Sequence, residues 1–328
     1  MQLLNEKQIL AFKNFIENHD SFIICGHKEP DGDCISSCIG LSKIIEHFKK
    51  PYLMLNAGPF KRVEIKKFAS LFKDALPFMT QDERNKTGLI MTDCSELHRL
   101  GELDGDMTGF DTFIIDHHKT SDSSMPDTII DPTSPAAVCL VFQIYEYLVG
   151  KPDAQTAEIL FFGLSTDTGY FRFLDSASAE VFRLAARLVE DGANPRKIYD
   201  YMTSGKPWNT RKLLGLMLER ATPYFNGKLI VTWETMEDTK KYGQDGRDSD
   251  ALYQMLLQAE GVEAVLFIRQ ETEHNCTLGL RSRDKIDVSL IAAKFGGGGH
   301  KNASGGSTEG QIDTLIPAIV KEFSKVIS

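Results

Sequence analysis

Four acidic or histidine-containing motifs follow short apolar segments in the first half of the chain. They are His27-Lys-Glu-Pro-Asp31-Gly-Asp33, Asp93, Asp116-His117-His118 and Asp167. In an open α/β sheet, the segments just past the strand ends meet in one crevice, where such sheets bind ligands. Carboxylate oxygens and imidazole nitrogens in one crevice can hold two divalent metal ions. The pattern therefore predicts an α/β fold and a metal-dependent phosphoesterase.

The apolar segments themselves have the length of buried parallel strands. Runs of four or five mostly apolar residues, bounded by turns, occur at 22–26, 51–55, 89–92 and 112–115. Such runs are typical of a parallel sheet covered by helices on both faces. Helical patterns then dominate from about 135 to 221, and Ser134-Pro135 is expected to provide an N-cap with proline at N1.

A second, smaller α/β domain is predicted in the last third of the chain, because 328 residues are enough for two domains. Strand patterns occur at 228–233, 264–268 and 276–282, and helical patterns at 248–259 and 287–294. We therefore expect a catalytic domain at 1–195, a helical linker at 196–215 and a substrate-binding domain at 216–328.

Charge and cysteine content narrow the class of protein. The net charge of −9 argues against a long electrostatic track for duplex nucleic acid, but it is compatible with a small anionic substrate. The six cysteines lack the spacing of a disulfide scaffold and are expected to be reduced core thiols, with a redox or zinc role for Cys34 and Cys38 as the alternative. No signal peptide or membrane helix is apparent, so we expect a cytoplasmic protein without a membrane partner.

Each motif also has a structural interpretation when it is considered alone. Pro-Asp-Gly-Asp is typical of a turn, in which Asp33 can cap the following helix. A single aspartate such as Asp93 is usually a cap or a surface residue, and Asp167 resembles part of a helix end that is followed by glycine. Two adjacent histidines after a buried strand are harder to explain by packing. The occurrence of all four motifs in this order favours the metal site.

The ordered motifs resemble those of the DHH phosphoesterase superfamily, which includes exonucleases, nanoRNases, cyclic-dinucleotide phosphodiesterases, pyrophosphatases and exopolyphosphatases. The resemblance implies a first metal ion held by His27, Asp31 and Asp93. It implies a second ion that shares Asp93 as a bridge. The other ligands of the second ion would be Asp33, His117 and Asp167.

The resemblance also assigns catalytic roles around the bridging Asp93. His118 would contact the scissile phosphate, and Asp116 would orient its neighbours. Mixed aspartate and histidine ligands suit Mn²⁺, with Mg²⁺, Co²⁺ or Zn²⁺ as substitutes. Two such ions make hydroxide available at neutral pH and stabilise charge on the phosphorus and on the leaving oxygen.

A second constellation lies near the C-terminus, in Phe295-Gly-Gly-Gly-Gly-His300 and in Arg281-Ser282. Glycine N–H groups can form an anion nest, and a guanidinium group can bind phosphate through two hydrogen bonds. A flexible loop and a solvated strand end are the alternatives. The pairing resembles the DHH-associated C-terminal domain, which implies a substrate-binding set. That set is Arg281, Ser282, Gly297, Gly298, Gly299 and His300.

Weaker candidates surround these motifs. Lys119 and Phe171-Arg172 are placed to reach the substrate, although a structural salt bridge explains Arg172 equally well. Trp208 and Trp233 are expected to pack in the core rather than to stack on a base.

The two-lobed layout most closely resembles the small bacterial bifunctional oligoribonucleases and 3′-phosphoadenosine 5′-phosphate (pAp) phosphatases, the nanoRNases. The expected reaction is hydrolysis of short RNA to nucleoside monophosphates, of pAp to AMP, or of both. A phosphodiesterase for cyclic or linear dinucleotides is the main alternative, and an exopolyphosphatase is a further one. A non-catalytic nucleotide sensor represents a different class. The resemblance also allows a homodimer.

Overall fold

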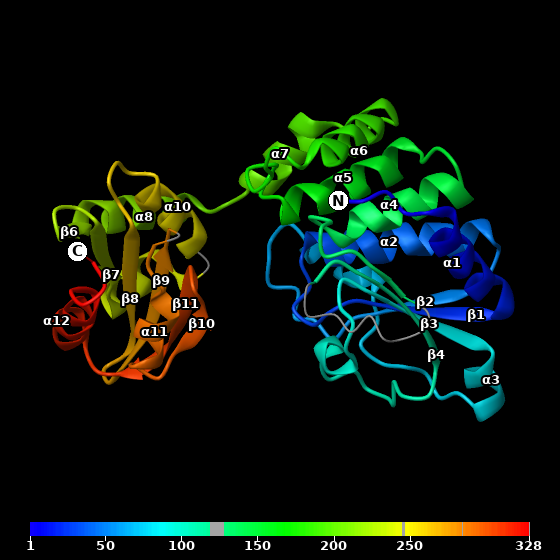
Figure 1. Ribbon diagram of the computed structural model, residues 1–328. Coiled ribbons are helices and arrows are strands. Elements are labelled where there is room, and N and C mark those ends of the chain that lie inside the picture. The colour runs from blue at the N-terminus through cyan, green and yellow to red at the C-terminus, as the bar shows by residue number, and fades with distance from the viewer. Residues whose placement is uncertain (119–127, 245–246, 284, 328) are drawn as a thin grey trace. The chain divides into compact units, whose positions relative to one another are not determined.

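The chain divides into two compact units, Met1–Gly205 and Lys206–Ser328 (Figure 1). The computed structural model describes residues 1–118, 128–244, 247–283 and 285–327, so Lys119 lies outside the described residues. The division falls within the segment 196–215, where we expect the linker. Helix α7 (Pro195–Thr203) ends the first unit, and α8 (Trp208–Arg220) begins the second.

The first unit is built on a parallel sheet with the order β2-β1-β3-β4-β5. All four neighbouring pairs of these strands are parallel. The strands are β1 (Ser21–Cys25), β2 (Tyr52–Leu55), β3 (Thr87–Thr92), β4 (Asp111–Asp116) and β5 (Thr128–Ile130). Residues of β3 are buried throughout, as expected for a strand covered on both faces. The predicted α/β fold with a parallel sheet is confirmed.

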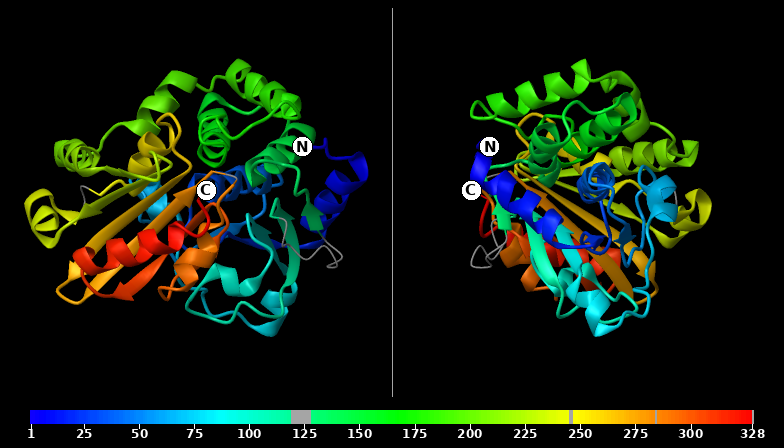
Figure 2. Two further views of the ribbon diagram at one scale, coloured as in Figure 1. Left: turned by 60° about the vertical axis from the view of Figure 1, so that its left-hand side comes forward. Right: turned by 90° about the vertical axis from the view of Figure 1, so that its right-hand side faces the viewer.

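Long helices cover one face of this sheet, where Phe22, Ile24 and Phe113 point into a large apolar core. These helices are α1 (Glu6–Asn18), α2 (Gly32–His47), α4 (Ala137–Leu148) and α5 (Ala154–Asp167). Helix α6 (Ala179–Glu190) and α7 pack on α5. Figures 1 and 2 show α2 lying along the strands with α4 and α5 beyond it. Helix α2 is therefore central, and its first turn lies at the strand ends.

Shorter elements cover the opposite face of the sheet. Ile23, Met91 and Ile114 pack there against Leu100 and Phe110. The elements of this region are η1 (Lys66–Leu71), α3 (Gln81–Asn85) and η2 (Leu97–Leu100). Because strand residues alternate between the two cores, the strand ends are held rigidly from both sides.

The second unit contains a mixed sheet with the order β10-β11-β9-β8-β7-β6. Its strands are β6 (Thr222–Tyr224), β7 (Leu229–Glu234), β8 (Ala264–Thr272), β9 (Asn275–Ser282), β10 (Gly298–His300) and β11 (Ala303–Glu309). Helices α8 and α10 (Ser249–Leu257) contribute to the core on one face, and α11 (Val288–Ala293) and α12 (Ile312–Phe323) to the core on the other. Helix α9 (Met236–Tyr242) packs beside α8.

None of the described helices, in either unit, is both long enough and apolar enough to cross a membrane.

Candidate metal centre

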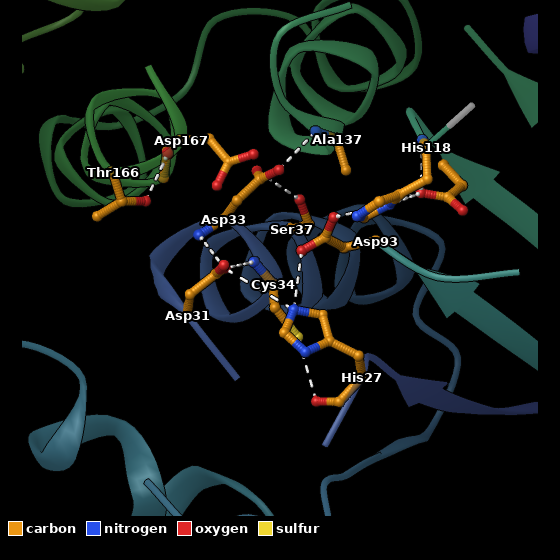
Figure 3. Close-up of polar contacts among 12 residues, drawn as sticks. His27, Asp31, Asp33, Cys34, Ser37, Asp93, His118, Ala137, Thr166 and Asp167 are labelled. Atoms are coloured by element: carbon orange, nitrogen blue, oxygen red, sulfur yellow. Dashed lines mark hydrogen bonds and ion pairs between the residues drawn. The ribbon is translucent and has the colours of Figure 1, made fainter. Parts of the chain in front are cut away.

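The four predicted motifs converge at the carboxyl ends of β1, β3 and β4, beside the first turn of α2 and the last turn of α5 (Figure 3). Three groups of side chains there have ligand atoms within 4.8 Å of one another. The groups are Asp93 with His117 and His118, Asp33 with His117 and Asp167, and His27 with Cys34 and Asp93. The fold therefore brings together residues that are up to 140 positions apart in the sequence.

Asp93 lies at the centre of this arrangement. Its Oδ2 is 3.3 Å from Nε2 of His27, and its Oδ1 is 3.3 Å from Nε2 of His117. The residue is buried and has a φ of 59°, a left-handed conformation that costs a non-glycine residue about 1–2 kcal/mol. The backbone N–H of Asp93 donates to the carbonyl of Ile115 on β4, which holds this turn in place. One carboxylate is thus placed between two imidazole groups.

Backbone carbonyls set the orientation of both imidazole rings. Nδ1 of His27 lies 2.8 Å from the carbonyl oxygen of Lys28, and Nδ1 of His117 lies 3.2 Å from that of Ser134. Each carbonyl accepts a hydrogen bond from Nδ1–H, which leaves Nε2 as the ring atom that faces the carboxylates. This arrangement is typical of metal-binding histidines, whose second nitrogen is fixed by a neighbouring oxygen.

The two aspartates of the Asp31-Gly-Asp33 turn have different structural partners. Asp31 is the N-cap of α2, and its Oδ1 accepts from the N–H groups of Asp33 and Cys34. Asp33 lies inside α2 and accepts from the N–H groups of Ala137 and Val138, at 2.6 and 2.8 Å. The expectation that Asp33 caps its own helix was wrong, because Asp31 occupies the cap and Asp33 caps α4 instead.

The prediction that Ser134-Pro135 provides a helix cap was also wrong, because Asp33 caps this helix. Helix α4 begins at Ala137, and its N-cap residue is Ala136. The Ser134 hydroxyl donates to the carbonyl of Ala136, and the Ser134 carbonyl serves His117. A carboxylate from another helix provides the capping group, which local sequence cannot indicate.

Asp167 and His118 complete the site from two sides. Asp167 is the last residue of α5, and its Oδ2 lies 3.4 Å from Nε2 of His117. His118 has Nδ1 2.8 Å from Oδ1 of Asp116, and the same oxygen accepts from the N–H groups of His117 and His118. Asp116 is buried, whereas a third of the His118 side chain is exposed. The bond to Asp116 therefore leaves Nε2 of His118 available to a substrate.

The charge balance of the cluster fits a divalent cation. Burial, together with the charges of Asp93 and Asp167, raises the pKa of Asp33 well above its usual value. Burial, with Asp31 and Asp93, also raises the pKa of Asp167 to about 7. Crowded carboxylates shift in this way when no cation compensates them. Oδ1 of Asp93 and Nε2 of His117 are also buried without a hydrogen bond, and a shared metal ion would satisfy both.

The pKa of the two histidines that face Asp93 is raised as well. Burial alone would lower the pKa of His27 and His117, but the Asp93 carboxylate outweighs it and raises both to about 9. Burial would raise the pKa of Asp93, yet His117 and His27 lower it to about 2. A proton on each histidine thus balances the charge of Asp93 as a metal ion would, and binding of a metal ion would displace these protons.

Comparison with known families identifies both units. The DHH family, N-terminal domain, matches residues 21–164, and the DHHA1 domain matches residues 226–328. The chain therefore contains a DHH domain followed by a DHHA1 domain. The residues that converge on Asp93 lie within the DHH match, except for Asp167, which follows it by three residues, and the glycine-rich segment lies within the DHHA1 domain.

Two curated relatives match almost the whole DHH–DHHA1 chain. The bifunctional oligoribonuclease and PAP phosphatase NrnA of Thermus thermophilus is 29% identical over 310 residues, covering 92% of this chain and 90% of the relative. The cyclic-di-AMP phosphodiesterase PdeA of Listeria monocytogenes is 24% identical over 308 residues, covering 88% of this chain but 45% of the relative. Among solved structures, an exopolyphosphatase-related protein from Bacteroides fragilis shares the fold. It has a TM-score of 0.81 and 23% identity, covering 100% of this chain and 97% of that one.

The DHHA1 domain places the predicted substrate-binding residues in one corner of its sheet. Arg281 on β9 and His300 on β10 both pair with Ala303 on β11. Directly opposed residues of antiparallel strands point to the same face, so Arg281 and His300 flank Ala303 on one face. The Arg281 guanidinium lies 4.4 Å from the ring centre of Tyr253 and donates to the carbonyl of Leu280.

The other members of this set have structural contacts. The Ser282 hydroxyl is buried and donates to the carbonyl of Ile286. The N–H of Gly297 donates to the carbonyl of Ala292, so it is already used at the end of α11. A Cβ on Gly297 would lie 2.6 Å from the carbonyl oxygen of Gly305, and one on Gly299, whose φ is 138°, would lie 2.6 Å from that of Ala303. Close approach of β11 requires glycine at both positions, and Gly298 lies between them with open space around it.

The structure shows the contacts or the exposure of the weaker candidates Phe171, Arg172, Trp208 and Trp233. Phe171 packs on the first core and stacks on Phe182, and Arg172 donates from Nε to the carbonyl of Gly169. Trp233 packs on the second core, as expected. Trp208 is 71% exposed, so the expectation of core packing was wrong for this residue. The sequence does not place Cys34 at the metal centre, although its position next to Asp33 is a signal.

Proposed function

We propose that this DHH–DHHA1 chain is a metal-dependent phosphoesterase. Its substrates are short oligoribonucleotides, which it hydrolyses to nucleoside monophosphates, and pAp, which it converts to AMP. The observation that carries the proposal is the position of the Asp93 carboxylate, 3.3 Å from Nε2 of both His27 and His117. One carboxylate between two imidazoles is suited to bridging two ions. The NrnA relative, which covers nearly the same length, supports the choice of substrate.

Two groups of ligands share Asp93 in this proposal. His27 and Asp31 hold one ion with it, and their closest approach, 3.9 Å from Nε2 to Oδ1, leaves room for a cation between them. The second ion is held by Asp33, His117 and Asp167. Two divalent ions supply positive charge to the phosphoryl group and make water acidic enough to attack it near neutral pH. Mn²⁺ suits this mixture of oxygen and nitrogen ligands, and Mg²⁺, Co²⁺ and Zn²⁺ are substitutes.

His118 positions and stabilises the scissile phosphate. Because Asp116 binds Nδ1–H of His118, Nε2 points away from Asp116 and is free to contact a phosphate oxygen. Contact between Nε2 and a phosphate oxygen would place the ring where negative charge builds up on the phosphate during hydrolysis.

The DHHA1 domain binds the remainder of the substrate through Arg281 and His300. Their common register against Ala303 gives two cationic or hydrogen-bonding side chains on one face of the sheet. Arg281 is partly buried and is supported by Tyr253, so its fork is pre-oriented for a phosphate. The net charge of −9 argues against long duplexes and agrees with a substrate of a few nucleotides.

Hydrolysis of cyclic or linear dinucleotides is the second candidate. It is favoured by the similarity to the phosphodiesterase PdeA, which extends over 88% of this chain. A catalytically inactive sensor is disfavoured, since a protein that only binds nucleotide has no need of the strained, buried Asp93.

A substrate panel with purified, metal-loaded protein tests the proposal. The panel contains RNA of two to five residues, pAp, linear and cyclic dinucleotides, and pyrophosphate, each assayed with Mn²⁺ and with chelator. We expect release of nucleoside monophosphate from short RNA and of AMP from pAp, and loss of both in Asp93→Ala. Asp82→Ala is the matched control, because Asp82 forms only an exposed ion pair with Lys86. Full activity of Asp93→Ala, or turnover of pyrophosphate alone, would refute the proposal.

A further inference from the structure

A cysteine thiol lies inside the proposed metal centre, whose other proposed ligands offer oxygen and nitrogen atoms. Sγ of Cys34 belongs to a group with His27 and Asp93 in which each pair of ligand atoms lies within 4.8 Å. Figure 3 shows the sulfur of Cys34 next to the ring of His27, at the start of α2. Ligands of a tetrahedral zinc ion are about 2.0–2.3 Å from it, which places two of them roughly 3.3–3.8 Å apart. The ligand atoms of this group lie within 4.8 Å of one another, so they would need to draw closer together to share an ion.

Local structure directs the thiol to this position. The backbone N–H of Cys34 donates to Oδ1 of Asp31 at 3.1 Å, which fixes the first turn of α2. Its sulfur lies against the end of β1, where a Cβ on Gly26 would be only 2.2 Å from it. Any larger residue at Gly26 would displace the sulfur. Cys34 is fully buried, 3.9 Å from the carbonyl oxygen of His27. The sulfur is therefore held beside the proposed ligand His27.

Asp93 contributes a buried oxygen to the space beside Cys34. The residue is 2% exposed, and its Oδ2 faces Nε2 of His27 at 3.3 Å, whereas its Oδ1, which makes no hydrogen bond, faces His117 in the other half of the centre. A buried carboxylate oxygen, an imidazole directed at it and a thiol within the same group together form a donor set with nitrogen, oxygen and sulfur.

The opposite half of the centre has a different composition. Its group consists of Asp33, His117 and Asp167, which offer oxygen and nitrogen atoms. Among the described residues, Cys34 is the one cysteine in the three groups of side chains that could hold a metal ion, which are called the metal-competent groups below. The two halves therefore differ in softness, since a thiolate favours Zn²⁺, Co²⁺ and Fe²⁺, whereas carboxylates suit Mn²⁺ and Mg²⁺.

We propose that Cys34 is a ligand of the metal ion held by His27 and Asp93, and that this half of the centre selects a softer ion than the half formed by Asp33, His117 and Asp167. The inference rests on the proposed metal centre and adds a ligand to it. On binding, the thiol releases its proton to solvent and the sulfur donates an electron pair to the ion, with no change in oxidation state. The centre is then a mixed-metal site with two distinguishable positions.

Cobalt spectroscopy of the full-length, metal-free protein tests this inference without reference to activity. Visible d–d bands report Co²⁺ bound by any ligand, whereas a near-ultraviolet sulfur-to-cobalt charge-transfer band requires a thiolate. We expect both in the wild type and loss of the charge-transfer band alone in Cys34→Ser. Cys38→Ser is the matched control, because Cys38 is equally buried one turn further along α2 and lies outside the metal-competent groups. It should keep both bands.

The outcomes separate this inference from the proposed function. Wild-type protein with d–d bands but no charge-transfer band refutes the role of Cys34 and leaves the metal centre intact. Failure to bind Co²⁺ at all refutes the metal centre and the role of Cys34 with it. The wild-type spectrum decides the matter even if Cys34→Ser does not fold.

Relative metal affinities give a second measurement. In competition with a chromophoric chelator, we expect Cys34→Ser to weaken Zn²⁺ binding by about tenfold or more, in the range typical of lost coordination-sphere interactions. The same substitution should change Mn²⁺ binding at the other position by less than about threefold. Equal weakening of both metals would contradict a soft ligand in one half of the centre.

Discussion

The carboxylate of Asp33 accepts a hydrogen bond from the backbone N–H of Ala137 at 2.6 Å, although the two residues are 104 positions apart. Asp33 lies in the first turn of α2, and Ala137 begins α4. The carboxylate therefore joins two helices and satisfies N–H groups that a helix start leaves unpaired. Its Oδ2 also lies 3.8 Å from Nε2 of His117, which connects this cap directly to the metal centre.

Replacing Asp33 should damage stability as well as activity. Asp33→Ala would leave the buried N–H groups of Ala137 and Val138 unpaired, and we expect the free energy of unfolding to fall by about 2–3 kcal/mol. Urea unfolding in chelator measures this loss without a metal contribution. Asp153→Ala, which removes the exposed N-cap of α5, should cost only about 1 kcal/mol. Equal losses for the two variants would contradict the bridging role of Asp33.

Asp116→Asn should reduce turnover while metal binding persists. The Asp116 carboxylate accepts from two backbone N–H groups and from Nδ1 of His118. Asparagine keeps one oxygen but loses the negative charge that holds Nδ1 of His118 in place, so we expect kcat to fall by about 10²-fold. The kcat of His118→Ala should fall by at least as much. Steady-state kinetics measures turnover, and metal stoichiometry measures metal binding. Loss of metal in Asp116→Asn would argue for a purely structural role of Asp116.

The metal-free protein should become less stable as pH rises from 6.5 to 9. The pKa of His27 and of His117 is raised from 6.5 to about 9, so the folded state retains protons that the unfolded state releases. Their contribution to stability is complete below pH 6.5 and is lost as pH rises through 9. At about 1.4 kcal/mol per pKa unit, the loss should reach a few kcal/mol. Thermal unfolding in chelator at several pH values measures it.

Two controls accompany the pH experiment. Asp93→Asn removes the charge that raises the pKa of both histidines, so its stability should vary less between pH 6.5 and 9. Saturating metal should reverse the wild-type trend, since metal binds the deprotonated histidines more readily at high pH. A metal-free wild type that gains stability over this range would contradict the assigned charge coupling.

Substitutions in the DHHA1 domain should affect substrate binding more than turnover. Arg281→Ala removes a charge-assisted contact to phosphate and should raise KM by about tenfold or more, whereas Arg281→Lys should recover only part of it because lysine lacks the planar fork. His300→Ala should act in the same direction. Lys285→Ala is the control, since this lysine is largely exposed. A fall in kcat without a change in KM would contradict the binding role.

The parallel sheet and the approximate position of the metal centre were predictable from local sequence. Apolar runs such as Thr112–Ile115 identify strands because a strand buried on both faces needs no alternation of polar residues. Polar residues that follow such strands, including His27, Asp93 and Asp116, must then meet at one edge of the sheet. Carboxylate and imidazole groups at one sheet edge indicate divalent metals even without a measured distance.

Other features depend on contacts between distant segments. The cap of α4 could not be assigned, because the capping Asp33 comes from a helix more than a hundred residues earlier. The exposure of Trp208 and the placement of the Cys34 sulfur against Gly26 likewise depend on packing. Sequence alone thus determined which chemical groups this protein brings to its strand ends, because strand periodicity is local. Tertiary structure alone decided which of those groups touch, because close packing sets the distance between atoms that the chain does not connect.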